Sequence, residues 1–186
     1  MAMIDLDKVN ALQNDIPFLK ARTEKENFLH QFAEVTAEAL NVYFVGIYFV
    51  DELRQNIVFV AGNGIIEDEL LKHHHKVQIA KDNPYMLQIG TAAYYQEIRL
   101  IDWLGNKILS YKILGKNMSE VKSETISDKR FGSPLLVESC TELQLPICKQ
   151  DKTIGIIEFV FNVKSNFDTK EITKLKLLVD ELAKVI

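Results

Sequence analysis

The sequence has few cysteines, and the two that it has do not form a recognisable motif. Cys140 and Cys148 are eight residues apart in a chain of 186 residues. This spacing matches no paired zinc-ligand motif. So few cysteines also exclude a disulfide framework and favour reduced thiols in a cytoplasmic protein.

The sequence also lacks long apolar runs and clusters of basic residues. No run reaches the ~18 apolar residues that a membrane-spanning helix needs. The first fifteen residues are acidic and amphipathic, unlike a secretory signal. Without a Lys/Arg cluster, nucleic-acid binding is not expected. We therefore expect a soluble domain that contacts neither nucleic acid nor membrane.

What is present is the composition of an ordinary globular chain. Hydrophobic residues make up 47% and charged residues 26%, and the formal net charge is −4. The length suits one domain with a helical extension. We assign residues 1–23 to an N-terminal helical extension and 24–186 to the domain.

Both ends of the chain are predicted to be helical. A stripe of apolar residues at spacings of three and four predicts a helix over 5–20, which Pro17 should kink or restart. Thr23 and Glu26 form a capping-box pattern, so a second helix should begin near Glu24 and end near 41. The pair at 168 and 171 marks the start of the last helix.

Between these ends the apolar pattern is that of strands. Residues 42–50 and 57–64 predict a hairpin, and 141–148 and 153–161 predict two more strands. The middle predicts a short helix over 65–75, a strand over 76–80, a helix opened by Pro84 and a strand over 93–101. The remainder, to about 134, is expected to be a long loop with at most one strand.

In this order the elements resemble the GAF domain family. The matching stretches are V-G-I-Y-F-V-D-E, A-G-N-G, T-E-L-Q-L-P-I, K-T-I-G-I-I-E-F and the final helix. The resemblance implies an α+β fold with a central antiparallel sheet of about six strands. The terminal helices would cover one face, and a small-molecule pocket and short helices would lie on the other.

Strand alternation places two acids on the pocket side. If the odd-numbered residues of 143–147 and 157–161 meet the terminal helices, Glu142 and Glu158 face the pocket. A turn centred on 150–151 would set Glu142 nearly opposite Glu158 or Phe159. Two close carboxylates raise one pKa or hold a cation, such as a ligand ammonium. The alternative, which we favour, is a salt bridge from Glu142 to Arg130 with Glu158 partly solvated.

Aromatic residues and one glycine complete the expected ligand site. Tyr48 is the strongest single candidate because it shares a face with Gly46, and a strand glycine often marks a close approach of a ligand. The set of candidate ligand-binding residues is Tyr48, Glu142, Glu158, Phe44, Gly46, Tyr94 and Trp103.

Other chemistries have weaker support. Free methionine-(R)-sulfoxide reductases are GAF proteins with similar stretches, but their chemistry needs an attacking and a resolving thiol, and this chain has no cysteine before Cys140. His73 and His75 could bind a metal only from a strand. Cys140 lacks the following histidine typical of bilin attachment, and the cyclic-nucleotide pattern is incomplete. We therefore predict no enzymatic activity, no metal and an unknown cofactor.

The terminal helices suggest how such a domain would act. The last helix carries an apolar stripe from Ile172 to Ile186 that is wider than one intramolecular face needs, and no capping residue ends it. This predicts a homodimer through the N- and C-terminal helices in a longer signal-transduction protein, for example a two-component system. The output domain would be a kinase or a cyclase. The alternative is a dimerisation scaffold that binds no ligand.

Overall fold

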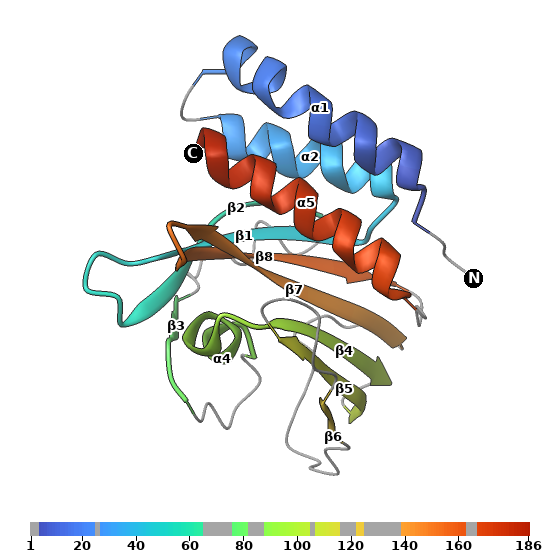
Figure 1. Ribbon diagram of the computed structural model, residues 1–186, viewed down its shortest axis with the longest axis vertical. Helices are drawn as coiled ribbons and strands as arrows, with labels where there is room; N and C mark the ends of the chain where they lie inside the picture. The colour runs from blue at the N-terminus through green and yellow to red at the C-terminus, as the bar shows by residue number, and fades with distance from the viewer. Residues whose placement is uncertain are drawn as a thin grey trace.

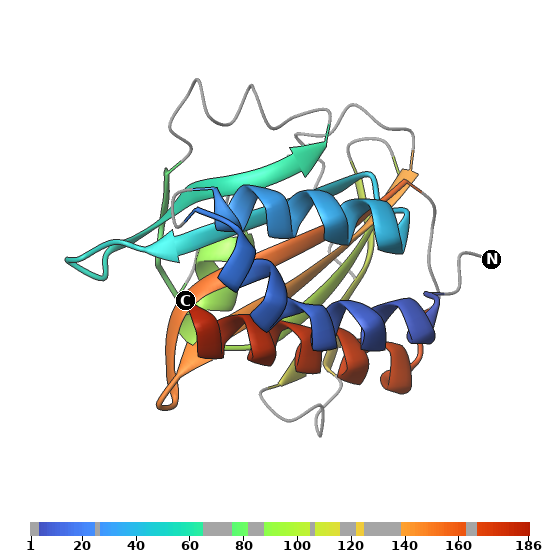
Figure 2. The same cartoon turned by 90° about the horizontal axis from the view of Figure 1, so that it is seen from above.

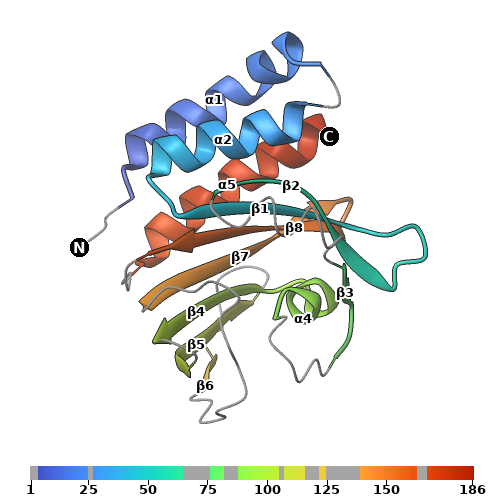
Figure 3. The ribbon, with the colours of Figure 1, turned by 180° about the vertical axis from the view of Figure 1, so that it is seen from behind.

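A computed structural model describes most of the chain as helices packed on one antiparallel sheet. The described residues are 4–24, 27–64, 76–81, 88–104, 107–115, 122–124, 139–162 and 167–186. Three helices lie on one face of the sheet and a shorter helix lies on the other (Figures 1 and 3). The helices are α1 (Leu6–Arg22), α2 (Phe28–Leu40), α4 (Gln88–Tyr95) and α5 (Thr169–Val185).

The described strands form one sheet in the order β3-β2-β1-β8-β7-β4-β5-β6, and every neighbouring pair is antiparallel. The edge strands β3 and β6 have three residues each, so six longer strands form the body. This confirms the predicted α+β class. The strands are β1 (Phe44–Val50), β2 (Asn56–Gly64), β3 (Lys76–Gln78), β4 (Ile98–Leu104), β5 (Lys107–Gly115), β6 (Lys122–Glu124), β7 (Ser139–Lys149) and β8 (Lys152–Phe161).

The helix starts follow the sequence at α5 but not at α2. At α5 the Asp168 carboxylate accepts from the Glu171 N–H at 2.8 Å, and the Glu171 carboxylate accepts from the Asp168 N–H at 3.0 Å. These two bonds form a capping box at the predicted start of the helix. The other Glu171 oxygen accepts from the Ile4 N–H at 3.1 Å, which ties the N-terminus to the start of α5.

At α2 the expected capping box is wrong. The helix begins at Phe28, with Asn27 at its N-cap and no side-chain capping bond. The Thr23 hydroxyl donates to the Gln31 side chain, and Thr23 itself is the C-cap residue of α1. Glu26 lies outside the described residues. Upstream, α1 runs through Pro17 to Arg22 as a single helix, so it does not restart at the proline.

The middle of the chain also departs from prediction in its boundaries. The residues expected to begin a strand at 93 are the last turn of α4, and β4 begins only at Ile98. The expected strand at 76–80 is present as β3. The expected loop contains two strands, β5 and β6, rather than at most one. The predicted helix over 65–75 lies outside the described residues.

The two faces of the sheet carry separate apolar clusters, as strand alternation predicted. The first cluster, the helix-face core, joins alternate strand residues such as Leu143, Leu145, Ile157 and Phe159 to α1, α2 and α5. The second, the α4-face cluster, joins α4 to the intervening strand residues, which are Phe44, Tyr48, Ile101, Cys140, Ile156 and Val160 together with β2 and β3 residues.

The apolar stripe of α5 is used within the chain. Ile172, Leu175, Leu178, Val179 and Leu182 are all buried in the helix-face core, where α1 runs beside α5 (Figure 2). The stripe is wide because it packs against two neighbours, α1 and the sheet, so its width alone does not require a partner chain. Among the large apolar residues of α1, α2 and α5, Phe18 and Leu177 remain exposed.

The register between β7 and β8 is set by a two-residue turn and one bulge. Gln150 and Asp151 both have positive φ, 48° and 60°, the conformation of a tight hairpin turn at the predicted position. The turn alone would place Glu142 opposite Phe159, which belongs to the other face. Opposed residues of an antiparallel pair share a face.

A bulge resolves this conflict. The register shifts between Ile147 and Cys148, so that Glu142 pairs with Val160 and Gln144 pairs with Glu158. A bulge adds one residue to one strand and so restores the matching of faces. The sequence prediction that Glu142 lies opposite Glu158 or Phe159 is therefore wrong, although the face assigned to both acids is correct.

Candidate functional site

Four neighbouring strands place a row of glycine and polar residues across the middle of the α4 face. In register, Gly46 of β1 lies opposite Glu158 of β8, Glu158 opposite Gln144 of β7, and Gln144 opposite Arg99 of β4. Neighbouring strands are about 4.8 Å apart, so the row brings a carboxylate, an amide and a guanidinium together. Apolar residues of the α4-face cluster flank it.

Glu158 is the centre of this row. One carboxylate oxygen accepts from the Tyr48 hydroxyl at 3.2 Å, and the other accepts from the Gln144 amide nitrogen at 3.0 Å. Burial raises the pKa of Glu158, and the hydrogen bonds from Gln144 and Tyr48 partly oppose that rise. The site therefore favours the neutral acid unless a further donor or a cation stabilises the carboxylate.

Tyr48 stays a hydrogen-bond donor in this setting. Its side chain is buried, and burial raises the pKa of Tyr48 well above the usual value near 10, with a further rise from the charges of Glu158 and Glu142. The hydroxyl is consequently protonated at any physiological pH.

Gln144 contributes a second acceptor, which the sequence analysis missed. Its side chain is 2% exposed, its amide nitrogen is committed to Glu158, and its amide oxygen has no hydrogen-bond partner among the described atoms. Buried amide oxygens are rarely left in this state. The sequence does place Gln144 on the same strand face as Glu142. A glutamine by itself, however, suggests no particular chemistry.

Glu142 lies on the same face but is not the direct partner of Glu158. It is opposite Val160 and therefore diagonal to Glu158, a spacing of about 7–8 Å between such positions. Its side chain is buried. The close carboxylate pair that we expected is thus replaced by a carboxylate–amide pair. The proposed partner Arg130 lies outside the described residues.

Arg99 is the other residue that the sequence analysis overlooked. Its side chain is 3% exposed, its guanidinium lies 3.3 Å from the Glu97 carboxylate and 6.0 Å from the centre of the Tyr95 ring. The Glu97 carboxylate and the Tyr95 ring fix the position of this buried guanidinium. It adds a positive charge at the end of the row opposite Gly46.

The glycine of the row is explained by packing. A side-chain carbon on Gly46 would lie 2.7 Å from the Phe44 ring and 2.9 Å from the Tyr48 ring. These rings also pack with Phe59, at centroid distances of 6.3 Å from Phe44 and 5.3 Å from Tyr48. Gly46 therefore allows the two rings to close over the strand, and in doing so it directs the Tyr48 hydroxyl to Glu158.

The remaining candidates are not brought into the row. Tyr94 lies in the last turn of α4, 50% exposed, with its ring edge against Tyr95. Its expected position in a strand was wrong because α4 extends through it. Trp103 lies in β4 opposite Cys140, and its side chain lies outside the described residues.

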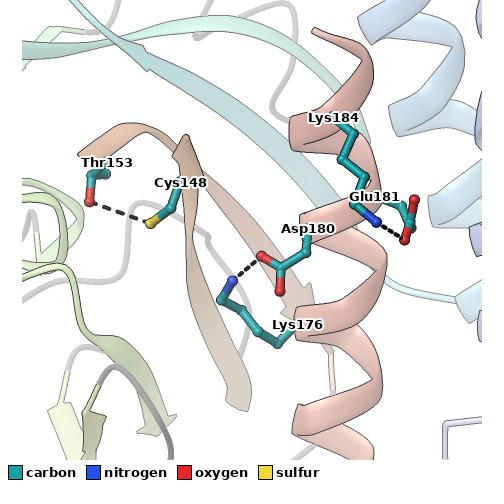
Figure 4. Close-up of polar contacts among 6 residues, drawn as sticks. All are labelled: Cys148, Thr153, Lys176, Asp180, Glu181 and Lys184. Atoms are coloured by element: carbon teal, nitrogen blue, oxygen red, sulfur yellow. Dashed lines mark hydrogen bonds and ion pairs between the residues drawn. The ribbon is translucent and has the colours of Figure 1, made fainter. Parts of the chain in front are cut away.

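The thiols and the histidines do not form a cluster in the described part. Cys140 is buried near the start of β7, whereas Cys148 is half-buried at the far end, with its sulfur 3.8 Å from the Thr153 hydroxyl (Figure 4). No group of three or more metal-binding side chains occurs among the described residues. His73 and His75 lie outside them. Likewise, no helix there has the length and hydropathy to cross a membrane.

Comparison with known proteins identifies similar structures but no similar sequence. No protein-family model and no curated protein matches the chain. Among solved structures, the GAF domain of an Acinetobacter phosphoenolpyruvate-protein phosphotransferase has a TM-score of 0.64 at 18% identity, covering 97% of this chain and 90% of its own.

Two further similar structures differ in function. The free methionine-R-sulfoxide reductase of Neisseria meningitidis, in complex with its substrate, has a TM-score of 0.65 at 17% identity, covering 100% of this chain and 92% of its own. The phycoerythrobilin-bound GAF domain of a cyanobacterial phytochrome has a TM-score of 0.66 at 12% identity, covering 95% and 92%. At these identities the similarity establishes the fold alone.

Proposed function

Because the chain has the GAF fold, we propose that it is a regulatory domain that binds a small molecule on the α4 face of the sheet. The main support is the Glu158 carboxyl group, which accepts hydrogen bonds from Tyr48 and Gln144 among the apolar residues of this face. Small-molecule sites typically combine apolar walls with a few converging polar groups.

The hydrogen-bonding inventory favours a ligand rich in donors. A carboxylate has about four acceptor positions, and the bonds from Tyr48 and Gln144 use two of those on Glu158. The Gln144 amide oxygen adds another acceptor. An ammonium group supplies three donors and a positive charge, which would also offset the burial of the Glu158 carboxylate. We therefore expect an amine or a similar cationic group on the ligand.

The signal would pass through the strands to the terminal helices. Glu158 stands between Ile157 and Phe159, whose side chains point to the other face and pack in the helix-face core. A ligand that repositions Glu158 would shift β8 against α1 and α5. In the signalling protein that we propose, these helices connect to an output domain such as a kinase or cyclase, in the cytoplasm. A homodimer through the same helices, with Phe18 and Leu177 as contact residues, belongs to this proposal.

Thermal unfolding with a panel of amines, amino acids and nucleotides tests the proposal. A ligand at a hundredfold excess over its dissociation constant should raise the unfolding free energy by about 2.7 kcal/mol. Tyr48→Phe and Glu158→Gln should reduce this stabilisation, and Tyr94→Phe, which alters an exposed tyrosine of α4, should not. A panel without any stabilising compound would favour the ligand-free scaffold.

We further propose that the chain is not a sulfoxide reductase. Cys140 and Cys148 lie at opposite ends of β7, so neither could resolve a sulfenic acid formed on the other without a large rearrangement. Incubation with methionine sulfoxide and a thiol reductant should give no turnover above that of a Cys140→Ser, Cys148→Ser double variant. Cysteine-dependent turnover would refute this part of the proposal.

A further inference from the structure

A cavity lies on the helix side of the sheet, away from Glu158. It is a groove of about 390 Å³ between the ends of the terminal helices and the strand turns. α5 ends on the same side of the molecule as the β1–β2 and β7–β8 turns (Figure 2). Lysines 20 and 149 and apolar residues line this Lys20–Lys149 groove, chiefly Leu29, Phe49, Val50 and Ile154.

The groove is an incompletely covered end of the helix-face core. Leu29, Phe49 and Ile154 pack against that core but are only half-buried, as is Ile186, the residue after α5. By contrast, Ile47 and Ile157 in the same strands are fully buried. The groove therefore has apolar walls that are partly shielded from solvent but leave room between them. Such walls are suited to an apolar ligand.

The charged side chains at the groove are both lysines. Lys20 is half-buried, with its ammonium 4.5 Å from the centre of the Phe28 ring, so its charge is held at the wall. Lys149 is exposed at the end of β7. Among the described residues that line the groove, none is acidic. The volume falls within the roughly 300–1,000 Å³ of small-molecule sites.

We infer that this groove binds a free alkyl carboxylate of medium chain length. The alkyl chain lies against Leu29, Phe49 and Ile154, and the carboxylate lies between Lys20 and Lys149. Such a ligand would join the last turn of α1 and the end of α5 to the strand turns. The site is distinct from the Glu158 site and does not depend on it.

Calorimetric titration of the chain with octanoate, decanoate and dodecanoate, each below its micelle-forming concentration, tests the inference. We expect saturable one-site binding that strengthens about fourfold for each added methylene. Charge reversal at both lysines, Lys20→Glu with Lys149→Glu, should weaken decanoate binding about tenfold. The matched control Lys8→Glu, at the other end of α1, should not change it.

A second variant separates loss of the site from loss of the fold. Leu29→Trp places a larger side chain in the groove from α2 and leaves both lysines in place, so it should abolish decanoate binding while circular dichroism still reports a folded chain. Glu158→Gln should bind decanoate as the parent does, which keeps the two sites distinguishable. Equal binding of decyltrimethylammonium, or binding only to phosphatidylglycerol vesicles and not to decanoate, would overturn the inference.

Discussion

The two faces of one sheet differ in how they treat polar groups. On the helix face, the inward-pointing residues of β7 and β8, such as Leu143 and Phe161, are apolar. Two polar side chains are buried near the edge of this face, and there the Thr141 hydroxyl donates to the Asp102 carboxylate at 2.7 Å. On the α4 face the same strands carry Glu158, Gln144 and Glu142 among apolar residues. Burying polar groups costs free energy unless they are fully paired.

This contrast separates stability from function within single strands. Odd-numbered residues of β8 pack against the terminal helices and stabilise the fold. Glu158 lowers the free energy of unfolding, because it buries a carboxyl group among apolar residues. Natural proteins tolerate such local conflicts mainly at functional sites. Substitutions on the helix face should therefore act on stability, and substitutions in the polar row should act on ligand binding and on the pH dependence of stability.

The largest effect is expected from a truncation in the helix-face core. Phe159 is fully buried between β7, β1 and the terminal helices, so Phe159→Ala should lower the unfolding free energy by about 3–5 kcal/mol. Urea denaturation followed by circular dichroism measures this loss. Leu177→Ala on the exposed side of α5 should change it by less than about 0.5 kcal/mol. A similar loss from both variants would contradict the assignment of the core.

A smaller effect, on both stability and ligand binding, is expected at Gly46. The added methyl group of Gly46→Ala would lie under 3 Å from the Phe44 and Tyr48 rings, and such overpacking typically costs about 1–3 kcal/mol. Because the rings must move, the Tyr48 hydroxyl should also leave Glu158. We expect weaker ligand stabilisation as well as a lower unfolding midpoint. A stability loss with ligand binding intact would show that the ring positions do not govern the site.

How far the sequence could predict this arrangement depends on the range of the interactions involved. Alternation within β7 and β8, the turn at 150–151 and the helix start at 168–171 are local patterns, and all three were predicted correctly. The pairing of Glu158 with Gln144 depends on one bulge near Cys148, for which Gly155 was the only local signal and was not used. The extent of α4 was missed because Tyr94 and Tyr95 have a high strand propensity that tertiary packing overrides.

The arginine of the row shows the same limit. Arg99 is buried only because strand β4 brings it opposite Gln144 and α4 places Tyr95 beside it. The pairing with Gln144 depends on the order of strands, which a periodic pattern does not encode, and the contact with Tyr95 depends on α4 continuing to that residue. The sequence could therefore identify the face of the candidate site but not all of its members.

A difference in pH dependence is expected at Glu158. Since its folded-state pKa is raised, the folded chain binds more protons at this residue than the unfolded chain does, and stability should fall as the pH rises above 4.5. Glu158→Gln removes this slope and should raise stability at neutral pH relative to the parent. Urea denaturation at pH 4, 5, 6 and 7 compares the two. Parallel pH profiles would mean that Glu158 titrates as it does in the unfolded chain.

The smallest effect is expected at the β1–β2 turn, where stability should change with pH in the opposite direction. Hydrogen bonds from the Asn56 side chain and from the Gln55 and Asn56 backbone lower the pKa of Asp51 to about 2, and Lys76 lies 3.6 Å from its carboxylate. The folded chain therefore holds fewer protons here than the unfolded chain, so this contribution is complete above about pH 4 and is lost as the pH falls toward 2. Asp51→Ala should remove that acid-side loss and leave the slope above pH 4.5 unchanged, whereas Glu158→Gln should do the reverse. Chemical denaturation of both variants between pH 2 and 7 measures the two slopes independently, because a surface turn and a polar row on the sheet face share no side chain.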